Sequence, residues 1–547
     1  MISTPLSVRA FSSSDIETFN IHPLFHPNQR HNISAIRQRV TNKIYFYIEE
    51  SWWNSITDEE KKALDERIYN IGARFSRDIY PRITSIFGDK PNHTVDDSDR
   101  ITILFHKMPR EVGGYFNSAD QHSVFRIPRS NERNIIYLNS RHIHNNLLEN
   151  FLVHEFIHLI TFNQKEVAHR VSEDIWLNDA RAEFAPTFLG FTESSGCNLR
   201  NRIFNFIKFA TTSLTEWIHK EEDYGVVSVF AHYLVDHYGI EILADSIKSE
   251  KIGIKSINEA LVKNGFSEDF SQIFTDWTIA SLVNDCSLGE RYCFLNPKLQ
   301  NLRISPQTTL LPELHGSSFS SREGTKSWAG NWHRIVGGLG DLVLDFDGDN
   351  EVSFVVPYVV CDNSGICDVR QISLDKNNKG SIVIEDFSKN YHSITFIPSI
   401  QSKISGFNGE EDEYFFEWSV STKERSHIVD NEEIISSLLV QIEELQAEIQ
   451  RLQLILEQRD SNKKIITKDL FIGSRGSEVF ALQEFLKNQG YEIYPEGLIT
   501  GNFLYLTKRA VVRFQERYAS EILHPIGLFR GTGFVGEMTR KKINIKI

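Results

Sequence analysis

The sequence predicts a multidomain protein in which an α+β domain is followed by a β-sandwich, a short coiled coil and a small helical domain. The chain has 547 residues, whereas one domain usually has about 100–200. Its apolar periodicity changes from mixed helix and strand patterns to short alternating runs, and then to a heptad repeat. Two similar helical patterns with glycine turns follow at the C-terminal end. One domain therefore cannot account for the chain.

The composition limits the class of protein. Apolar residues make up 40% of the chain and charged residues 24%, which is ordinary for a soluble globular protein. No window approaches the roughly 20 apolar residues that are needed to cross a bilayer. The formal net charge is -14, and no local stripe of Lys and Arg among aromatic residues offsets it. We therefore expect no transmembrane segment and no nucleic-acid partner.

Five cysteines are too few for a disulfide scaffold in a chain of this length. Cys286 and Cys293 are close in sequence, as are Cys361 and Cys367. Either pair could close a small loop in an oxidising compartment, which would leave Cys197 without a partner. The alternative is that all of them are reduced, buried thiols.

The N-terminal part combines a polar leader with strand and helix patterns. Residues 1–42 show no period and are expected to form an N-terminal arm; they lack the basic start and apolar core of a secretory signal. The protein is therefore cytoplasmic, or the chain begins after a processing site. From Lys43, "KIYFYIEE" predicts a strand, and a long helix should follow between an N-cap at Thr57 and a stop at Gly88. Residues 145–285 are expected to be mainly helical.

Two further segments have distinct periods. Residues 301–428 contain short alternating runs between Gly, Asn and Asp turns, which predicts an antiparallel β-sandwich with an accessory role. Residues 432–459 carry a heptad seam, which favours a parallel two-stranded coiled coil and hence a homodimer. The alternative is a helix that packs on its own chain. The seam consists of Ile435, Leu438, Ile442, Leu445, Ile449, Leu452 and Leu456.

The stretch "NFLVHEFIHLITFNQKE" contains two histidines and a glutamate in an apolar frame. His154 and His158 are four residues apart, so on a helix they share a face and can bind one metal ion. Glu155 lies beside them and could take a proton from a water. The apolar frame predicts that these three side chains are buried. Buried polar groups without partners cost free energy, and a zinc ion would supply the missing partner. The alternative is a pair of core histidines with a partnered glutamate.

A catalytic zinc site takes three protein ligands, so another ligand is required. Gln164 stands where a metzincin would have its third histidine, which excludes that class. The helix pattern "WLNDARAEFA" resembles the gluzincin motif, and the resemblance implies that Asp179 is the third ligand and that Glu183 supports His154. The motif has Glu where this chain has Asp179. Because Asp is shorter, Glu183 remains an alternative ligand.

The order of motifs over residues 43–300 resembles a hyicolysin-type neutral zinc metallopeptidase. The resemblance implies a zincin-like α+β fold, a Zn2+ cofactor and hydrolysis of a protein or peptide substrate, with Glu155 as general base. Relatives in the wider class carry a tyrosine that donates to the oxyanion; Tyr224 is its match, and His232 is a second candidate. Tyr224 could equally anchor the start of a helix. The motifs are "RITILFHKM", "GGYFNSAD", "SNERNIIYLNS", "LVHEFIHLITFNQK", "WLNDARAEFA", "DYGVVSVFAHYLVDHYG" and "FTDWTIASLVND".

The tail, residues 466–547, resembles the peptidoglycan-binding domain that is often attached to wall-associated enzymes. Its "GTGFVGEMTRKKIN" repeats the pattern of "GLITGNFLYLTKRAV". Leu504 stands where the family commonly has Gly. The resemblance rests on Gly473, Gly476, Val479, Leu482, Gln483, Leu486, Gly490, Gly497, Thr500, Gly501, Phe503, Thr507, Ala510, Val511, Phe514 and Gln515.

The two resemblances imply a secreted or cell-envelope zinc endopeptidase that its tail holds near peptidoglycan. Two alternatives stay open. The first is a wall-binding or structural protein whose peptidase-like domain is inactive, since Asp179 departs from the motif. The second is an enzyme that cleaves the peptide cross-links of peptidoglycan.

Overall fold

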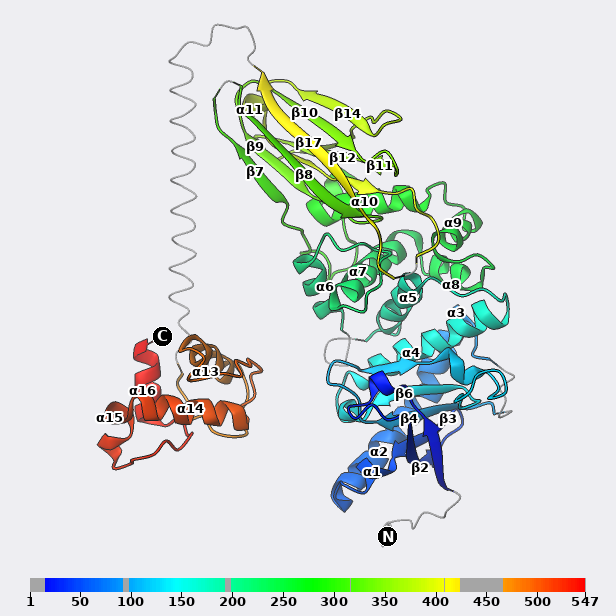
Figure 1. Ribbon diagram of the computed structural model, residues 1–547, viewed down its shortest axis with the longest axis vertical. Helices are drawn as coiled ribbons and strands as arrows, with labels where there is room; N and C mark the ends of the chain where they lie inside the picture. The colour runs from blue at the N-terminus through cyan, green and yellow to red at the C-terminus, as the bar shows by residue number, and fades with distance from the viewer. Residues whose placement is uncertain are drawn as a thin grey trace. The chain divides into compact units, whose positions relative to one another are not determined.

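The computed structural model divides into two compact units, residues 1–425 and 426–547. The first unit contains the N-terminal sheet, the following helices and the C-terminal strands, and the second contains the small helical domain (Figure 1). The coiled coil predicted over 432–459 and the predicted odd cysteine, Cys197, lie outside the described residues. The structure describes residues 15–91, 98–191, 198–314, 316–407, 409–423 and 466–546.

A six-stranded sheet forms the N-terminal part of the first unit, with strand order β1-β2-β3-β4-β6-β5. Strands β3, β4 and β6 are parallel, and β5 pairs antiparallel with β6 at the edge. Apolar side chains of β3, β4 and β6 are buried in the core. The strands are β1 (Ile16–Asn20), β2 (Asn32–Val40), β3 (Ile44–Glu49), β4 (Ile101–His106), β5 (Gly114–Phe116) and β6 (Ile135–Asn139).

The prediction of an arm over residues 1–42 is wrong for the part that the structure describes. Strands β1 and β2 form an antiparallel pair, and β2 joins the main sheet through β3. A bulge between Arg37 and Arg39 interrupts the alternation of buried and exposed residues in β2. Because that alternation is short and its outer residues are polar, the strand pattern was hidden in the sequence.

The helix predicted between Thr57 and Gly88 is present but interrupted. Helix α1 (Glu50–Trp53) precedes it, and α2 (Asp58–Arg74) passes through a π-helical turn at Phe75–Ile79 into α3 (Tyr80–Phe87). The Thr57 hydroxyl accepts from the N–H of Glu60, whose carboxylate accepts from the N–H of Thr57. Gly88 ends α3 with φ +91°, a conformation that favours glycine. Both predicted helix ends are thus confirmed.

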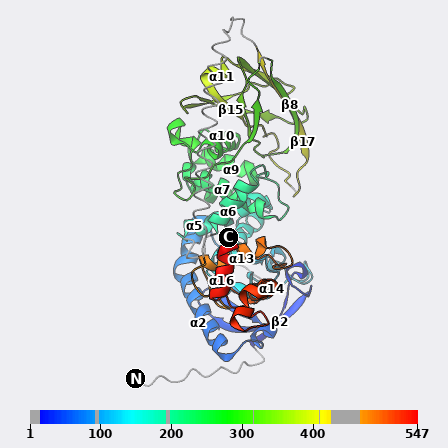
Figure 2. The same ribbon diagram turned by 90° about the vertical axis from the view of Figure 1, so that its left-hand side faces the viewer.

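The region predicted to be helical over 145–285 contains seven of the described helices. They lie between the N-terminal sheet and the C-terminal strands of this unit (Figure 1, Figure 2). Most are buried along one face or completely, and they contribute to one large apolar core. The helices are α4 (Leu148–Phe162), α5 (Ile175–Phe188), α6 (Leu199–Lys208), α7 (Glu221–Tyr238), α8 (Glu241–Lys248), α9 (Gly253–Lys263) and α10 (Phe270–Val283).

Two sheets follow the helices, of order β14-β10-β17-β8 and β13-β12-β15-β9-β7. Side chains from both, among them Phe346 and Phe396, enclose a common core, as the predicted sandwich requires. Only β7 and β9 of these sheets pair in parallel. Helix α11 (Phe387–Asn390) and a two-stranded pair, β11 and β16, complete this part. The strands are β7 (Gln307–Leu311), β8 (Ser318–Lys326), β9 (His333–Gly337), β10 (Asp341–Gly348), β11 (Phe354–Val355), β12 (Pro357–Asp362), β13 (Cys367–Gln371), β14 (Lys379–Ile384), β15 (Tyr391–Phe396), β16 (Ser399–Ile400) and β17 (Glu413–Lys423).

Both predicted cysteine pairs form disulfides. Cys286 bonds to Cys293 directly after α10, and Cys361 bonds to Cys367 across the hairpin of β12 and β13. The alternative of reduced thiols is therefore wrong for these four residues.

The second unit is a small helical domain with its own apolar core. The predicted internal repeat is confirmed, because in each copy a helix glutamine holds the following loop. Its amide oxygen accepts from two successive N–H groups, and its amide nitrogen donates to a threonine on the next helix. The first copy consists of Gln483, Thr500, Gly501 and Thr507, and the second of Gln515, Thr532, Gly533 and Thr539. The helices are α13 (Ser477–Asn488), α14 (Tyr505–Arg517), α15 (Ala519–Ile522) and α16 (Glu537–Lys546).

Candidate metal centre

Helices α4 and α5 bring three predicted ligands to one point. His154, His158 and Asp179 each offer a donor atom, and these atoms lie within 4.8 Å of one another. The Oδ1 atom of Asp179 is 3.3 Å from Nε2 of His154 and 3.7 Å from Nε2 of His158. Two imidazole nitrogens and one carboxylate oxygen are a donor set that zinc accepts in catalytic sites. The residues present therefore fit a zinc ion.

Glu183 lies behind His154, one helical turn after Asp179. Its Oε1 atom is 3.4 Å from Nδ1 of His154, the ring nitrogen that does not face Asp179. Arg202 on α6 donates to both carboxylate oxygens of Glu183, with two contacts of 2.8 Å. Because both oxygens are engaged, the geometry favours a supporting role for Glu183 over the alternative role of ligand.

Charge fixes the protonation of this pair. Burial raises the pKa of Glu183, but the positive charge of Arg202 and the contact with His154 outweigh it and lower the pKa to about 2. Burial lowers the pKa of His154, whereas the contacts with Asp179 and Glu183 raise it to about 10. Glu183 is therefore ionised at neutral pH. The imidazole of His154 is protonated there in the absence of a metal, so a bound zinc ion would displace the proton from its Nε2 atom.

Glu155 is buried between α4 and the edge strand β5. The backbone of Phe116 on β5 lies close enough to its carboxylate to favour the ionised form slightly. A Cβ atom at Gly114 would lie 3.2 Å from Cγ of Glu155 and 2.7 Å from the carbonyl oxygen of Tyr137, so glycine permits this close approach. Burial raises the pKa of Glu155, although the charges of His154 and His158 oppose the rise. A carboxylate with a raised pKa is a stronger base than an ordinary one.

The two oxyanion candidates lie on α7 in different surroundings. The ring of Tyr224 is 6.4 Å from the ring of His154, and the guanidinium of Arg202 lies 4.6 Å from the Tyr224 ring centroid. Burial raises the pKa of Tyr224, so its hydroxyl remains a donor. His232 is fully buried, and its ring nitrogens contact the Ser228 carbonyl at 2.7 Å and the Thr187 hydroxyl at 2.9 Å. We therefore assign His232 to the packing of α7 on α5 and withdraw it as an oxyanion candidate.

Arg202 is the site residue that the sequence did not indicate. It contacts Glu183 through hydrogen bonds and Tyr224 through its ring, and thereby links α5, α6 and α7. It is one of two arginines in the first turns of an amphipathic helix, "LRNRIFNFIK". Its position in the sequence does not distinguish it from a surface arginine. Only its contact with the buried Glu183 on α5 does.

Comparison with known proteins identifies one part of the chain. Residues 475–519 match the family described as "Putative peptidoglycan binding domain". The chain carries a peptidoglycan-binding domain near its C-terminus. No curated protein sequence matches the chain. Among the described residues, no helix is both long and apolar enough to span a membrane.

Solved structures similar to part of the chain have very low identity. The pre-peptidase C-terminal domain of a collagenase from Bacillus anthracis is 6% identical with a TM-score of 0.14, covering 21% of this chain and 96% of that one. The periplasmic inhibitor of g-type lysozyme from Aeromonas hydrophila is 9% identical with a TM-score of 0.14, covering 21% of this chain and 98% of that one.

Proposed function

We propose that the chain is a zinc-dependent endopeptidase that hydrolyses protein or peptide bonds and is held at the cell wall by its C-terminal domain. The observation that carries the proposal is the convergence of His154, His158 and Asp179, with the buried carboxylate of Glu155 beside them. A structural cluster of core histidines needs neither a third donor at this distance nor a base next to an edge strand.

Each residue then has a defined role in hydrolysis. The zinc ion, when bound, would polarise the scissile carbonyl and lower the pKa of a water. Glu155 would accept a proton from the attacking water and deliver it to the leaving amine. Tyr224 donates a hydrogen bond to the developing oxyanion. Strand β5 pairs only with β6 among the described strands, so its other edge can pair with an extended peptide substrate.

The proposed setting is secretion or attachment to the cell envelope. Two disulfides favour an oxidising compartment, and peptidoglycan is the partner of the C-terminal domain. The heptad seam over 432–459 supports a homodimer in that setting.

Metal analysis and proteolysis together test the enzyme. We expect the purified full chain to contain one zinc per molecule and to hydrolyse casein, with activity lost to a chelator and restored by zinc. A zinc-free protein without casein turnover would favour the inactive wall protein instead. Because the tail binds peptidoglycan, a cross-link endopeptidase is the second candidate, and release of muropeptides from purified sacculi without casein turnover would identify it.

The tail is expected to bind cell walls without the enzyme. A fragment of residues 466–547 has its own apolar core, so it should fold and co-sediment with purified peptidoglycan. Removal of the same residues should leave hydrolysis of a soluble peptide nearly unchanged, because no site residue lies in the tail. A folded fragment that stays in the supernatant at every wall concentration would refute the anchoring role. An unrelated fragment of similar size and charge serves as the control.

A further inference from the structure

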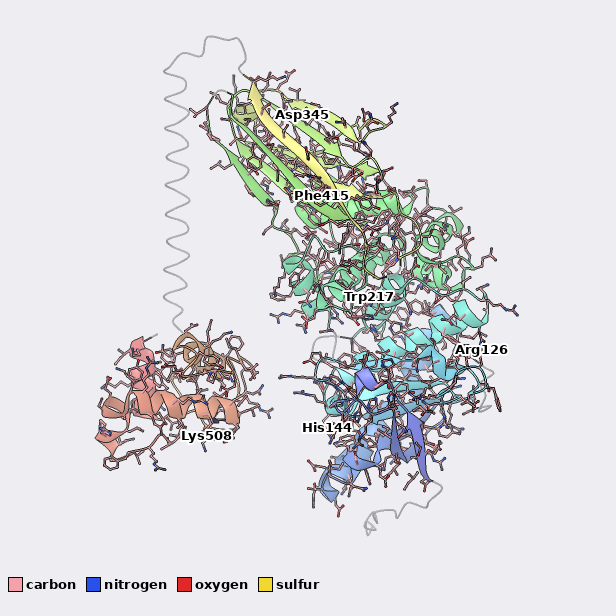
Figure 3. All side chains as sticks on the ribbon, viewed as in Figure 1. Arg126, His144, Trp217, Asp345, Phe415 and Lys508 are labelled. Carbon is pink, nitrogen blue, oxygen red and sulfur yellow. A yellow bond between two sulfur atoms is a disulfide. The ribbon has the colours of Figure 1, made fainter. Side chains whose placement is uncertain are left out.

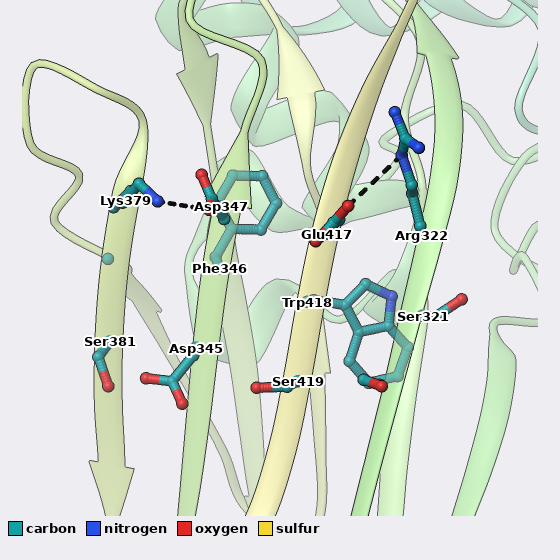
Figure 4. A pocket seen from close by; sticks show the side chains of 12 residues that line it. Ser321, Arg322, Asp345, Phe346, Asp347, Lys379, Ser381, Glu417, Trp418 and Ser419 are labelled. Atoms are coloured by element: carbon teal, nitrogen blue, oxygen red, sulfur yellow. Dashed lines mark hydrogen bonds and ion pairs between the residues drawn. The ribbon is translucent and has the colours of Figure 1, made fainter.

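The outer face of the four-stranded sheet carries a hollow of about 740 Å³ that the proposed peptidase does not use (Figure 4). This volume lies within the range of about 300–1,000 Å³ that is typical of ligand sites. The residues that line it come from all four strands and are mostly polar.

One row of charged residues crosses the hollow. The strand register places Lys379, Asp347, Glu417 and Arg322 opposite one another in that order. Lys379 is 2.6 Å from Asp347, and Arg322 is 3.5 Å from Glu417. Each cation is thus matched by a carboxylate, and the row as a whole is neutral.

The next row contains hydroxyls around one carboxylate. Ser381, Asp345, Ser419 and Ser320 face one another across the four strands. Among the residues that the structure describes, these four side chains have no hydrogen-bond partner. Asp345 has no cation beside it, so the hollow has an excess of one negative charge at its centre. The row offers one strong acceptor and three groups that can both donate and accept.

An aromatic ring lies next to these rows. Phe415 on β17 and Asp345 on β10 belong to the same sheet (Figure 3). Phe415 is two residues before Glu417, so it projects from the same face, and the residue is 43% exposed. The guanidinium of Arg322 lies 4.8 Å from its ring centroid. An exposed ring beside unpaired hydrogen-bonding groups presents both an apolar surface and polar contacts to a ligand.

We propose that this hollow binds a neutral, hydroxyl-rich polysaccharide strand. Sugar hydroxyls donate to Asp345 and exchange hydrogen bonds with the serines, and the C–H face of a sugar ring packs on Phe415. A polyanion is disfavoured because Lys379 and Arg322 are already neutralised while Asp345 is not. A basic peptide is disfavoured because those same two cations lie at both ends of the charged row. The sandwich then holds the enzyme to a glycan, independently of the metal centre.

Affinity electrophoresis of the full chain tests this site, in native gels containing dextran, glucomannan, hydroxyethyl cellulose or glycol chitin. We expect at least one of these polymers to retard the wild-type protein. Asp345→Ala should weaken the binding at least tenfold, and Ser381→Trp should do the same by filling the hollow. Asp368→Ala, which removes an exposed acid from the other sheet, should bind like the wild type. Equal unfolding temperatures would establish that the variants are folded, as expected for exposed positions.

Three outcomes would overturn the proposal. The first is a wild-type protein that none of the four polymers retards. The second is equal retardation of the wild type and both hollow variants, which would place binding elsewhere, including the C-terminal domain. The third is selective binding of dextran sulfate or polylysine. Glu155→Gln should bind the polysaccharide normally, so failure of the peptidase proposal and failure of this one are distinguishable.

Discussion

Glu155→Gln is expected to keep its zinc and to lose at least about a hundredfold in peptide hydrolysis, the usual scale for removal of a general base. The substitution keeps the size of the side chain and one oxygen that can accept a hydrogen bond. It removes the group that accepts a proton. Glu155 is not among the three converging donors, so the metal content should not change.

The measurement is kcat/KM on a fluorogenic peptide together with zinc per molecule. Glu166→Gln is the matched control, because it is the same change shortly after α4 and outside the candidate centre. Its activity should equal that of the wild type. Full activity in a zinc-loaded Glu155→Gln protein would end the proposed mechanism, and activity lost together with zinc would show that Glu155 acts on the metal rather than on the water.

The sequence predicted those parts of the site that follow from local helical geometry. His154 and His158 share a face because four residues are nearly one helical turn, and Asp179 and Glu183 repeat that spacing on α5. The structure brings His154, His158 and Asp179 together and places Glu183 behind His154. Assignment of zinc and of catalysis stays a proposal, because it rests on what these residues can do chemically.

Tertiary contacts determine what the sequence did not reveal. Arg202 acquires its role only because α6 packs against α7 and brings it to the buried Glu183. His232 was a second oxyanion candidate, yet its hydrogen bonds to Ser228 and Thr187 depend on helix packing. Strand β2 was missed because a bulge breaks its alternation, which only pairing with β3 makes visible. The hollow in the sandwich likewise depends on strand register, which short alternating runs do not specify.

Asp179→Ala is expected to purify largely without zinc, whereas Glu183→Ala should retain zinc with activity reduced by roughly 10- to 100-fold. Asp179 supplies the oxygen that lies within reach of both Nε2 atoms. Glu183 faces the other nitrogen of His154, and Arg202 engages both of its oxygens. Removal of a metal ligand loses donor atoms directly, but removal of a residue behind a ligand only loosens the imidazole and lowers its basicity.

Zinc per molecule, measured on each purified variant after dialysis against a weak chelator, decides the ranking. Asp245→Ala, which removes a half-buried carboxylate of α8 that pairs with Lys263 outside the candidate centre, should retain zinc and activity. Asp179→Glu should bind zinc only if α5 retreats by about 1.5 Å, the length of one methylene. Zinc lost from Glu183→Ala but kept by Asp179→Ala would make Glu183 the ligand and would require Arg202 to release it. Zinc kept by both alanine variants would mean that the third donor to His154 and His158 comes from elsewhere in the chain, and the assignment of Asp179 would be wrong.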